Sequence, residues 1–169
     1  MDAKTQTTRV IPAAAVPEGA GVTVHRTIGM PTLRNFDPFL LLDHISSDDP
    51  NDYIAGFPSH PHRGFNTFTY MIDGHMTHQD SMGNSGDLGP GGAQWMKAAS
   101  GVIHSEMPKQ KDGLLRGFQL WINLPANHKM DHPEYHLKLC NILSSRIVIA
   151  MYHYLRLCLL LESNFIRIP

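Results

Sequence analysis

Turn-forming residues are concentrated in one part of this chain. All 14 glycines and 11 of the 12 prolines precede Leu137. In that part, short apolar runs recur about every ten residues, separated by Gly, Pro, Asn and Asp, which is typical of an all-β sandwich or barrel. Turns spaced so closely leave no room for long helices. We therefore expect an all-β domain over residues 1–136 and a different kind of segment over residues 137–169.

Several runs show the alternation of a strand with one buried face. Residues 118–124 alternate apolar residues with Gln119, Trp121 and Asn123. Comparable runs occupy residues 22–28, 39–42, 65–72, 94–98 and 102–106. Asp73-Gly74 is a favourable hairpin dipeptide, so we expect a further strand near residues 75–80. The glycine-rich segments 83–86 and 89–92 match no phosphate-binding loop, and we expect hairpin turns there.

Composition narrows the class of protein. The chain has 169 residues, 42% of them hydrophobic, and a net charge of −1 without a cluster of Lys or Arg, which argues against direct nucleic-acid binding. Residues 1–10 lack the apolar core of a signal peptide. The two cysteines, Cys140 and Cys158, cannot form a disulfide framework. We expect a cytoplasmic protein, or a nuclear one in a eukaryote.

The segment 137–169 differs from the rest in charge as well as in glycine content. Four basic residues against Glu162 give it +3, whereas residues 1–136 hold ten basic and fourteen acidic residues. Its apolar runs, 147–152 and 157–161, are shorter than the roughly 18 residues that a membrane-spanning helix needs. We expect no membrane association, and either an apolar helix resting on the barrel or self-association through these runs.

Two pairs of metal-binding residue types stand at strand spacing. His60 and His62 flank Pro61, and His104 and Glu106 flank Ser105. In a strand, residues i and i+2 point to the same face, so two facing strands would form a four-ligand cage. Imidazole with one carboxylate suits Fe(II), Mn, Ni, Cu or Zn, and leaves coordination positions open for water, dioxygen or substrate. A single HxH pair is more often a solvated face, but two pairs favour a metal site.

The remaining histidines carry less weight. His75 and His78 flank the expected hairpin and could approach the site as supporting donors, but we expect both at an exposed strand edge. Three others stand beside turn residues and are expected on the surface: His44, His128 and His132. Ser105 points away from the two residues beside it, so a serine hydrolase would lack a base within reach.

The segment from Asn35 to Tyr135, about three-fifths of the chain, closely resembles the pirin family of the cupin superfamily. The resemblance is carried by long motifs: His60-Pro61-His62-Arg63-Gly64-Phe65, Gln94-Trp95-Met96, Gly101-Val102-Ile103-His104-Ser105-Glu106-Met107-Pro108 and Gly117-Phe118-Gln119-Leu120-Trp121-Ile122-Asn123-Leu124-Pro125. It implies a jelly-roll-like β-barrel of the cupin type. It also implies one divalent metal, usually iron, held by His60, His62, His104 and Glu106.

The resemblance implies two different activities. Some family members resemble quercetin 2,3-dioxygenases, which open a flavonol ring with dioxygen, and others are described as metal- and redox-dependent transcription coregulators that act on a protein partner. We favour the enzyme, with Glu106 accepting the proton of the substrate 3-hydroxyl. The coregulator and an inactive fragment remain as alternatives.

The chain departs from the family pattern in two places. Asn66 stands where the family usually has glutamate in HPHRGFET, which removes a negative charge near the cage. Pirins have two barrels, whereas residues 137–169 resemble no part of the family. We therefore expect a truncated or frame-shifted product, with an N-terminal cupin barrel over residues 1–136 and an unrelated tail.

Overall fold

A computed structural model of the chain describes residues 9–138 and 165–168. Nearly all regular structure in these residues is β-strand, and helix is limited to two single 3-10 turns, η1 (Pro50–Asp52) and η2 (Ala126–His128). The strands are β1 (Arg9–Pro12), β2 (Ala14–Glu18), β3 (Val22–Ile28), β4 (Phe39–Ser47), β5 (Phe57–His62), β6 (Phe65–Asp73), β7 (Met76–Asp80), β8 (Ser85–Leu88), β9 (Ala93–Lys97), β10 (Val102–Pro108), β11 (Leu115–Asn123), β12 (Glu134–Lys138) and β13 (Phe165–Ile168).

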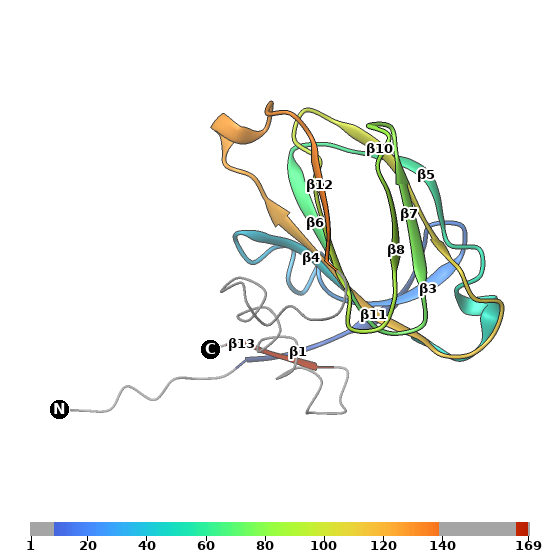
Figure 1. Ribbon diagram of the computed structural model, residues 1–169. Helices are drawn as coiled ribbons and strands as arrows, with labels where there is room; N and C mark the ends of the chain where they lie inside the picture. Colours follow the sequence, from blue (N-terminus) through green and yellow to red (C-terminus); the bar gives the residue numbers. More distant parts are fainter. Residues whose placement is uncertain (1–8, 139–164, 169) are drawn as a thin grey trace.

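Two antiparallel sheets face each other across the interior (Figure 1). The smaller sheet has four strands in the order β5-β10-β7-β8, and the larger has seven in the order β12-β9-β6-β11-β4-β3-β2. β1 pairs with β13 as a separate two-stranded ribbon. The all-β barrel predicted from turn spacing is confirmed. Each of the strands expected from alternation is also present, in most cases extended by a few residues.

The core is built from the alternation of the strands. One apolar cluster, which includes Ile45, Met71, Met76, Leu88 and Leu115, fills one end of the space between the sheets, and Met96, Ala98 and Val102 fill another part. The opposite face of the seven-stranded sheet carries its own buried cluster, with Ile28, Leu42, Phe68, Phe118 and Leu120. The larger sheet therefore buries side chains on both faces, but the inner face also carries buried polar residues such as Thr69 and Gln94. A slip of one residue would exchange the two sets of side chains, so the strand register is fixed.

Turn-forming residues in the sequence correctly located the turns, but they did not always show which strand pairs with the strand that follows. Residues 83–84 do close a hairpin, because β7 pairs with β8. The Asp73-Gly74 turn does not: β6 belongs to the seven-stranded sheet and β7 to the four-stranded one. Gly74 has a φ of 79°, and a Cβ there would lie 2.8 Å from Leu115, so glycine is required at this corner. Residues 89–92 likewise connect the two sheets, and the hairpins expected at these two places are wrong.

The end of the described chain bears on the expected boundary at residue 136. β12 continues to Lys138 and pairs with β9 along its whole length. Residues 165–168 form β13, antiparallel to β1. The apolar runs 147–152 and 157–161, for which we expect a helix, lie outside the described residues, so the tail helix and the domain boundary stay predictions.

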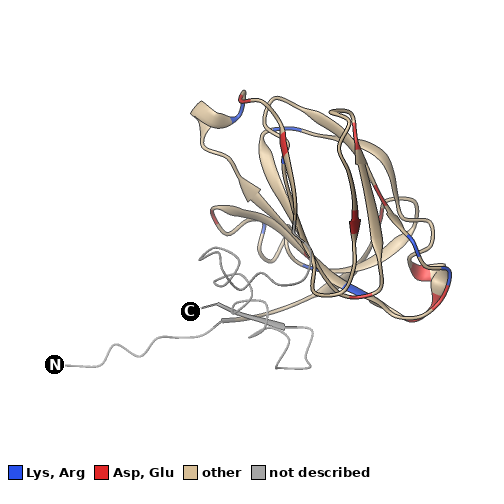
Figure 2. Ribbon diagram, viewed as in Figure 1, with Lys and Arg blue, Asp and Glu red and all other residues tan. Residues whose placement is uncertain are grey.

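Basic residues are distributed over several parts of the described chain. Lys and Arg appear as separate blue segments along the ribbon in Figure 2. Within residues 9–138 and 165–168, no helix is long and apolar enough to cross a membrane.

Candidate metal centre

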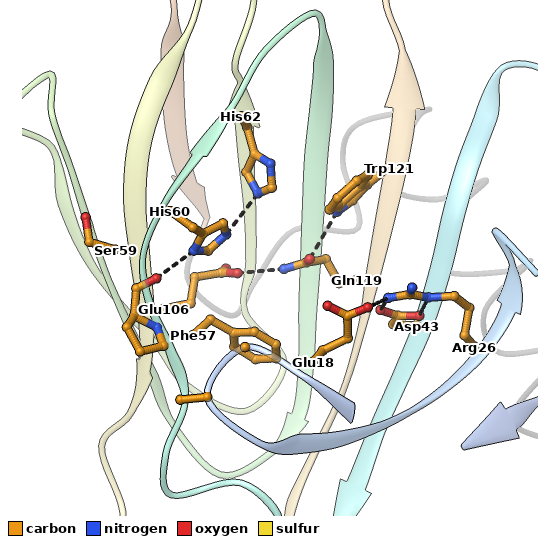
Figure 3. Close-up of a pocket in the computed structure, with 13 residues that line it drawn as sticks. Glu18, Arg26, Asp43, Phe57, Ser59, His60, His62, Glu106, Gln119 and Trp121 are labelled. Atoms are coloured by element: carbon orange, nitrogen blue, oxygen red, sulfur yellow. Dashed lines mark hydrogen bonds and ion pairs between the residues drawn. The ribbon is translucent and has the colours of Figure 1, made fainter. Parts of the chain in front are cut away.

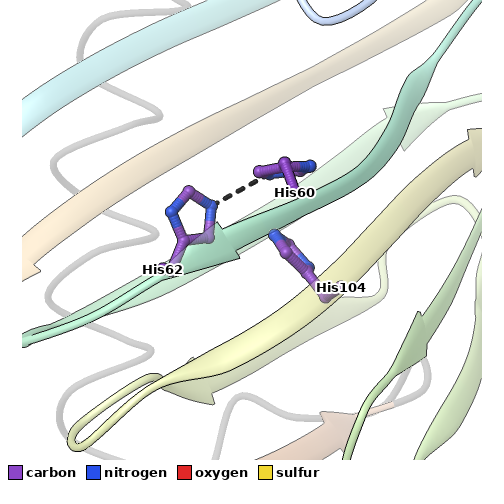
Figure 4. Close-up of side chains that lie close together, drawn as sticks. All are labelled: His60, His62 and His104. Atoms are coloured by element: carbon purple, nitrogen blue, oxygen red, sulfur yellow. Dashed lines mark hydrogen bonds between the residues drawn. The ribbon is translucent and has the colours of Figure 1, made fainter.

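Three histidines converge because β5 and β10 are neighbours in the four-stranded sheet. His60 lies opposite His104 in the register of these strands, and His62 lies opposite Val102. The imidazoles therefore meet on the interior face, with ring centroids 4.4 Å apart for His60 and His104 and 4.8 Å apart for His62 and His104 (Figure 4). One nitrogen from each of the three rings lies within 4.8 Å of the others. A single ion could contact all three.

Hydrogen bonding determines which nitrogen of His60 faces this cage. Its Nδ1 lies 2.7 Å from the carbonyl oxygen of Pro58. Because a carbonyl can only accept, Nδ1 must carry the proton, and Nε2 keeps its lone pair. That Nε2 is 3.0 Å from Nε2 of His62 (Figures 3 and 4). The His60 tautomer is thus the one that a metal ligand bound through Nε2 requires.

Burial keeps the other two imidazoles neutral. His62 is 8% exposed and His104 is 2% exposed. Loss of water, with repulsion from neighbouring histidines, lowers the pKa of His62 to about 4 and that of His104 to about 2. Neutral imidazole is the metal-binding form. Nε2 of His104 is buried without a hydrogen-bond partner, an arrangement that a metal ion would complete. The donor set therefore fits a divalent metal.

Glu106 approaches the cage from β10 and is held by the opposite sheet. It is 2% exposed. Its Oε1 accepts from Gln94 Nε2 and from Thr69 Oγ1 at 3.3 Å, and its Oε2 accepts from Gln119 Nε2 at 2.6 Å (Figure 3). Amide groups donate to both oxygens of this side chain, so both oxygens act as acceptors. Oε2 has one acceptor position left.

The four residues expected as ligands do not all belong to one close group. His60, His62 and His104 form one group within 4.8 Å, and Glu106 belongs to a second group with His104 and His78. His104 is common to both. The structure therefore brings the three histidines together directly and places the carboxylate next to His104.

The sequence did not reveal the roles of Gln94 and Gln119. The hydroxyl of Tyr135 donates to Oε1 of Gln94 over 3.1 Å, and this leaves the amide nitrogen of Gln94 to face Glu106. The available signal was a polar residue at the inward position of an otherwise apolar strand. Its partner is in the other sheet and could not be inferred from alternation.

A row of polar residues crosses the interior face of the seven-stranded sheet. Register places its members side by side on five adjacent strands, β9, β6, β11, β4 and β3: Gln94, Thr69, Gln119, Asp43 and Arg26. At one end, Arg26 makes two 2.7 Å contacts with Asp43 and one with Glu18. Hydrogen bonding to Asp43 raises the pKa of Arg26, so the guanidinium stays charged. Glu106 inserts into this row from the facing sheet.

A cavity of about 370 Å³ connects the cage with the Arg26 end of the row (Figure 3). The residues that line it are Glu18, Gly19, Ala20, Arg26, Asp43, Phe57, Pro58, Ser59, His60, His62, Glu106, Gln119 and Trp121. Its volume falls within the range of small-molecule sites, roughly 300–1,000 Å³.

Two histidines are not where the sequence suggested. His78 is 1% exposed rather than at an open edge, because β7 lies between β8 and β10 and turns this residue inward. His44 is not a surface group either: β4 is an internal strand, and the imidazole stacks on Phe118 with centroids 4.6 Å apart. The other three, His75, His128 and His132, are exposed as predicted.

Asn66 lies away from the cage. It alternates with Thr67 and Thr69 on β6, and Thr69 contacts Glu106 in the interior. Asn66 therefore faces the outer side of the sheet, where it is buried. Replacement of the usual glutamate at this position leaves the donors around the cage unchanged.

Comparisons with known proteins identify the family and the fold. The family model Pirin matches residues 21–122. A putative quercetin 2,3-dioxygenase of Pseudomonas aeruginosa is 61% identical over 113 residues, which cover 67% of this chain and 40% of that protein. Quercetin 2,3-dioxygenase from Acinetobacter baumannii has a similar structure, with a TM-score of 0.72, 28% identity and coverage of 83% of this chain and 48% of that one.

A third protein, the bacterial pirin YhhW of Escherichia coli in complex with nickel(II), shares the fold with a TM-score of 0.67 at 23% identity, over 82% of this chain and 60% of that one. The barrel is therefore of the cupin type. The chain spans less than half the length of three curated relatives that it matches. Since the family model covers more than half of its residues, the chain belongs to the pirin family.

Proposed function

We propose that this chain forms the metal-bearing barrel of a quercetin 2,3-dioxygenase-type enzyme, which opens a flavonol ring with dioxygen. The observation that carries the proposal is the cage itself: the imidazoles of His60, His62 and His104 converge beside the Glu106 carboxylate, next to a cavity of small-molecule size. The names of the Pseudomonas and Acinetobacter proteins support the same reaction.

The metal ligands in this proposal are His60, His62, His104 and Glu106. A nitrogen-rich set with one carboxylate suits Fe(II), our first choice, and also Mn, Ni, Cu or Zn. The nickel complex of the Escherichia coli pirin supports a divalent metal in this fold. A bound metal would supply Lewis-acid and dioxygen chemistry.

The chain's own residues would bind and orient the substrate. Trp121 stacks on Phe65 with centroids 4.5 Å apart and meets His62 edge-on at 5.0 Å, so a rigid aromatic wall stands beside the cage. Phe57 also lines the cavity. Flat apolar walls favour a planar aromatic substrate. The carboxylates at the Arg26 end offer acceptors for its ring hydroxyls.

Glu106 would take the proton of the 3-hydroxyl group. Its Oε1 already accepts two hydrogen bonds, whereas Oε2 accepts one, from Gln119. The free acceptor position on Oε2 is thus the site for a substrate proton or for the metal. The amides of Gln94 and Gln119 hold the carboxylate in place while the proton moves.

Oxygen uptake tests the proposal directly. The chain is purified without oxygen, its metal content is measured, and quercetin is added with oxygen in solution. Metal-dependent oxygen uptake with loss of the flavonol absorbance supports the enzyme. Tight metal binding without uptake would instead support a metal- or redox-dependent coregulator that acts on a protein partner. Folded protein that binds no metal would identify an inactive fragment.

A further inference from the structure

The two ring nitrogens of His104 have different surroundings. Nε2 is buried at the cage and has no hydrogen-bond partner. Nδ1 lies 3.4 Å from Nδ1 of His78. On its other side, His78 presents Nε2 to Oδ2 of Asp80, also at 3.4 Å. Asp80, His78 and His104 thus form a continuous series of contacts that leads from a turn to the cage.

Strand pairing and packing hold these three residues in place. β7 and β10 are antiparallel neighbours, with His104 opposite Asp80 and Glu106 opposite His78. The side chains of His78 and Asp80 are 0% and 1% exposed. Tyr135 stacks on His78 with ring centroids 4.3 Å apart and planes 11° apart. Water therefore cannot replace either partner of His78, and the ring is held in its plane.

The turn after β7 determines which oxygen of Asp80 faces His78. Oδ1 accepts from the backbone N–H groups of Met82 and Asn84, each at 2.9 Å. A backbone N–H can only donate, so this position requires an acceptor. Oδ2 accepts from Nδ2 of Asn84 at 2.9 Å, and its remaining acceptor position faces His78. The turn thus fixes the carboxylate independently of the histidines.

The position of each proton in this series of side chains follows from the acceptor at Asp80. A carboxylate oxygen accepts, so Nε2 of His78 carries a proton and its Nδ1 keeps a lone pair. That lone pair accepts from Nδ1–H of His104, and Nε2 of His104 is left with the lone pair that faces the cage. We propose that Asp80 and His78 are positioning residues that set the tautomer of His104, so that its Nε2 is free to bind a divalent metal.

This proposal rests on the metal site proposed above, but it can be tested separately from it. The tautomer of His104 is a property of the metal-free protein, whereas zinc affinity requires the site. Partners of this kind orient metal-bound histidines in other proteins, and their loss typically weakens metal binding roughly 10- to 100-fold. If His78 only fills space beside Tyr135, an aromatic replacement of His78 would change neither property.

Asp80→Asn is the sharpest variant. Asparagine has nearly the same volume, and the backbone N–H groups of Met82 and Asn84 keep its oxygen at the Oδ1 position. Its NH2 group then takes the place of Oδ2 and donates to Nε2 of His78. The side-chain amide of Asn84, whose Nδ2 donates to Oδ2 in the unchanged chain, must turn its oxygen toward this NH2 group. The proton of His78 moves to Nδ1, and the proton of His104 moves to Nε2, where it blocks the metal. In a Ser-His-Asp triad, replacement of the aspartate by asparagine likewise keeps the geometry but gives the histidine the wrong tautomer.

The experiment compares the unchanged chain with Asp80→Asn, His78→Phe and His75→Phe. His75 is the matched control, because it precedes β7 and its side chain is 51% exposed. Imidazole ¹⁵N shifts, with the His104 signals assigned from a His104→Gln variant, report the tautomer in metal-free protein. Titration with Zn²⁺ alone reports affinity.

We expect a lone pair on Nε2 of His104 in the unchanged chain and in His75→Phe, and a proton there in Asp80→Asn. Zinc binding should weaken roughly 10- to 100-fold in Asp80→Asn and in His78→Phe. An unchanged His104 tautomer in folded Asp80→Asn would overturn the proposal. Zinc binding that weakens in His78→Phe but not in Asp80→Asn would overturn it as well. If the unchanged chain binds no zinc, the proposed metal site is wrong. The tautomer of His104 in metal-free Asp80→Asn still tests whether Asp80 and His78 set that tautomer.

Discussion

The indole N–H of Trp121 donates to Oε1 of Gln119 over 3.1 Å, so the Gln119 amide can present only its NH2 group to Glu106. Tyr135 fixes Gln94 in the same way from another strand. Two amides of determined orientation therefore face one buried carboxylate. Substitutions around this carboxylate should affect both the stability of the barrel and the chemistry of the cage.

Gln119→Leu should destabilise the protein. The substitution removes the donor to Oε2 of Glu106 and leaves a buried charge with fewer partners. Hydrogen bonds to charged groups contribute about 1.5–3 kcal/mol, and we expect a loss of that size in the free energy of unfolding. Urea denaturation of the metal-free protein measures it. Gln79→Leu, at an exposed position on β7, is the control, and an equal loss in both would contradict this role for Gln119.

Glu106→Gln should abolish most oxygen uptake with quercetin. The amide cannot take a proton from the 3-hydroxyl group, and it places an NH2 group among the donors Gln94 and Gln119. Metal analysis alongside the assay separates loss of metal from loss of the base. Glu134→Gln changes an exposed glutamate on β12 and should leave uptake unchanged. Full activity in metal-loaded Glu106→Gln would remove Glu106 from the proton step.

His44 should make stability depend on pH in acid. Burial, with repulsion from His25 and Arg116, lowers the pKa of His44 to about 4. Between its ordinary pKa of 6.5 and about 4, the unfolded chain binds a proton that the folded chain does not, so stability falls as the pH falls through this window. In His44→Phe, the loss of stability between pH 7 and pH 4.5 should be smaller by about 2 kcal/mol.

Chemical denaturation at the two pH values measures the effect in metal-free protein. His132→Phe is the control, because His132 is exposed. Since His44 stacks on Phe118, on the face of the sheet opposite the cavity, the comparison leaves the cage intact. Equal pH dependence in the unchanged chain and in His44→Phe would show that His44 does not contribute.

Deletion of residues 139–169 should leave metal content unchanged in the protein that folds. All the proposed ligands lie between residues 60 and 106, and β12 is retained as far as Lys138. The deletion removes β13 and leaves β1 without its pairing partner, so a change in solubility or oligomer size is expected. Loss of metal from folded, shortened protein would show that the segment is part of the barrel.

The sequence was informative wherever a residue's environment depends on its own strand. Alternation from Phe118 to Leu124 correctly predicted β11, and the i, i+2 spacing of His60 and His62 correctly placed both on one strand. The motifs also led to the correct family. These features need only the geometry of a single strand and a recognisable run of residues.

Features that depend on the position of a strand within a sheet were missed. Asp73-Gly74 identified a turn, but no local signal shows that the next strand joins the other sheet. His78 was expected outside because nothing in its neighbourhood reveals that β7 has a strand on each side. The approach of Gln94 to Glu106 depends on the packing of two sheets, which alternation does not specify.

The place of Tyr135 in the chain sets an order of events during synthesis. Tyr135 belongs to β12, and its hydroxyl orients Gln94, which lies 41 residues earlier, while its ring covers His78. Because synthesis starts at the N-terminus, every proposed ligand is made before Tyr135, which contacts the residues around them. A nascent chain that ends before residue 135 would hold these histidines without the contacts of Tyr135 to Gln94 and His78. The surroundings of the cage described above are complete only when β12 pairs with β9.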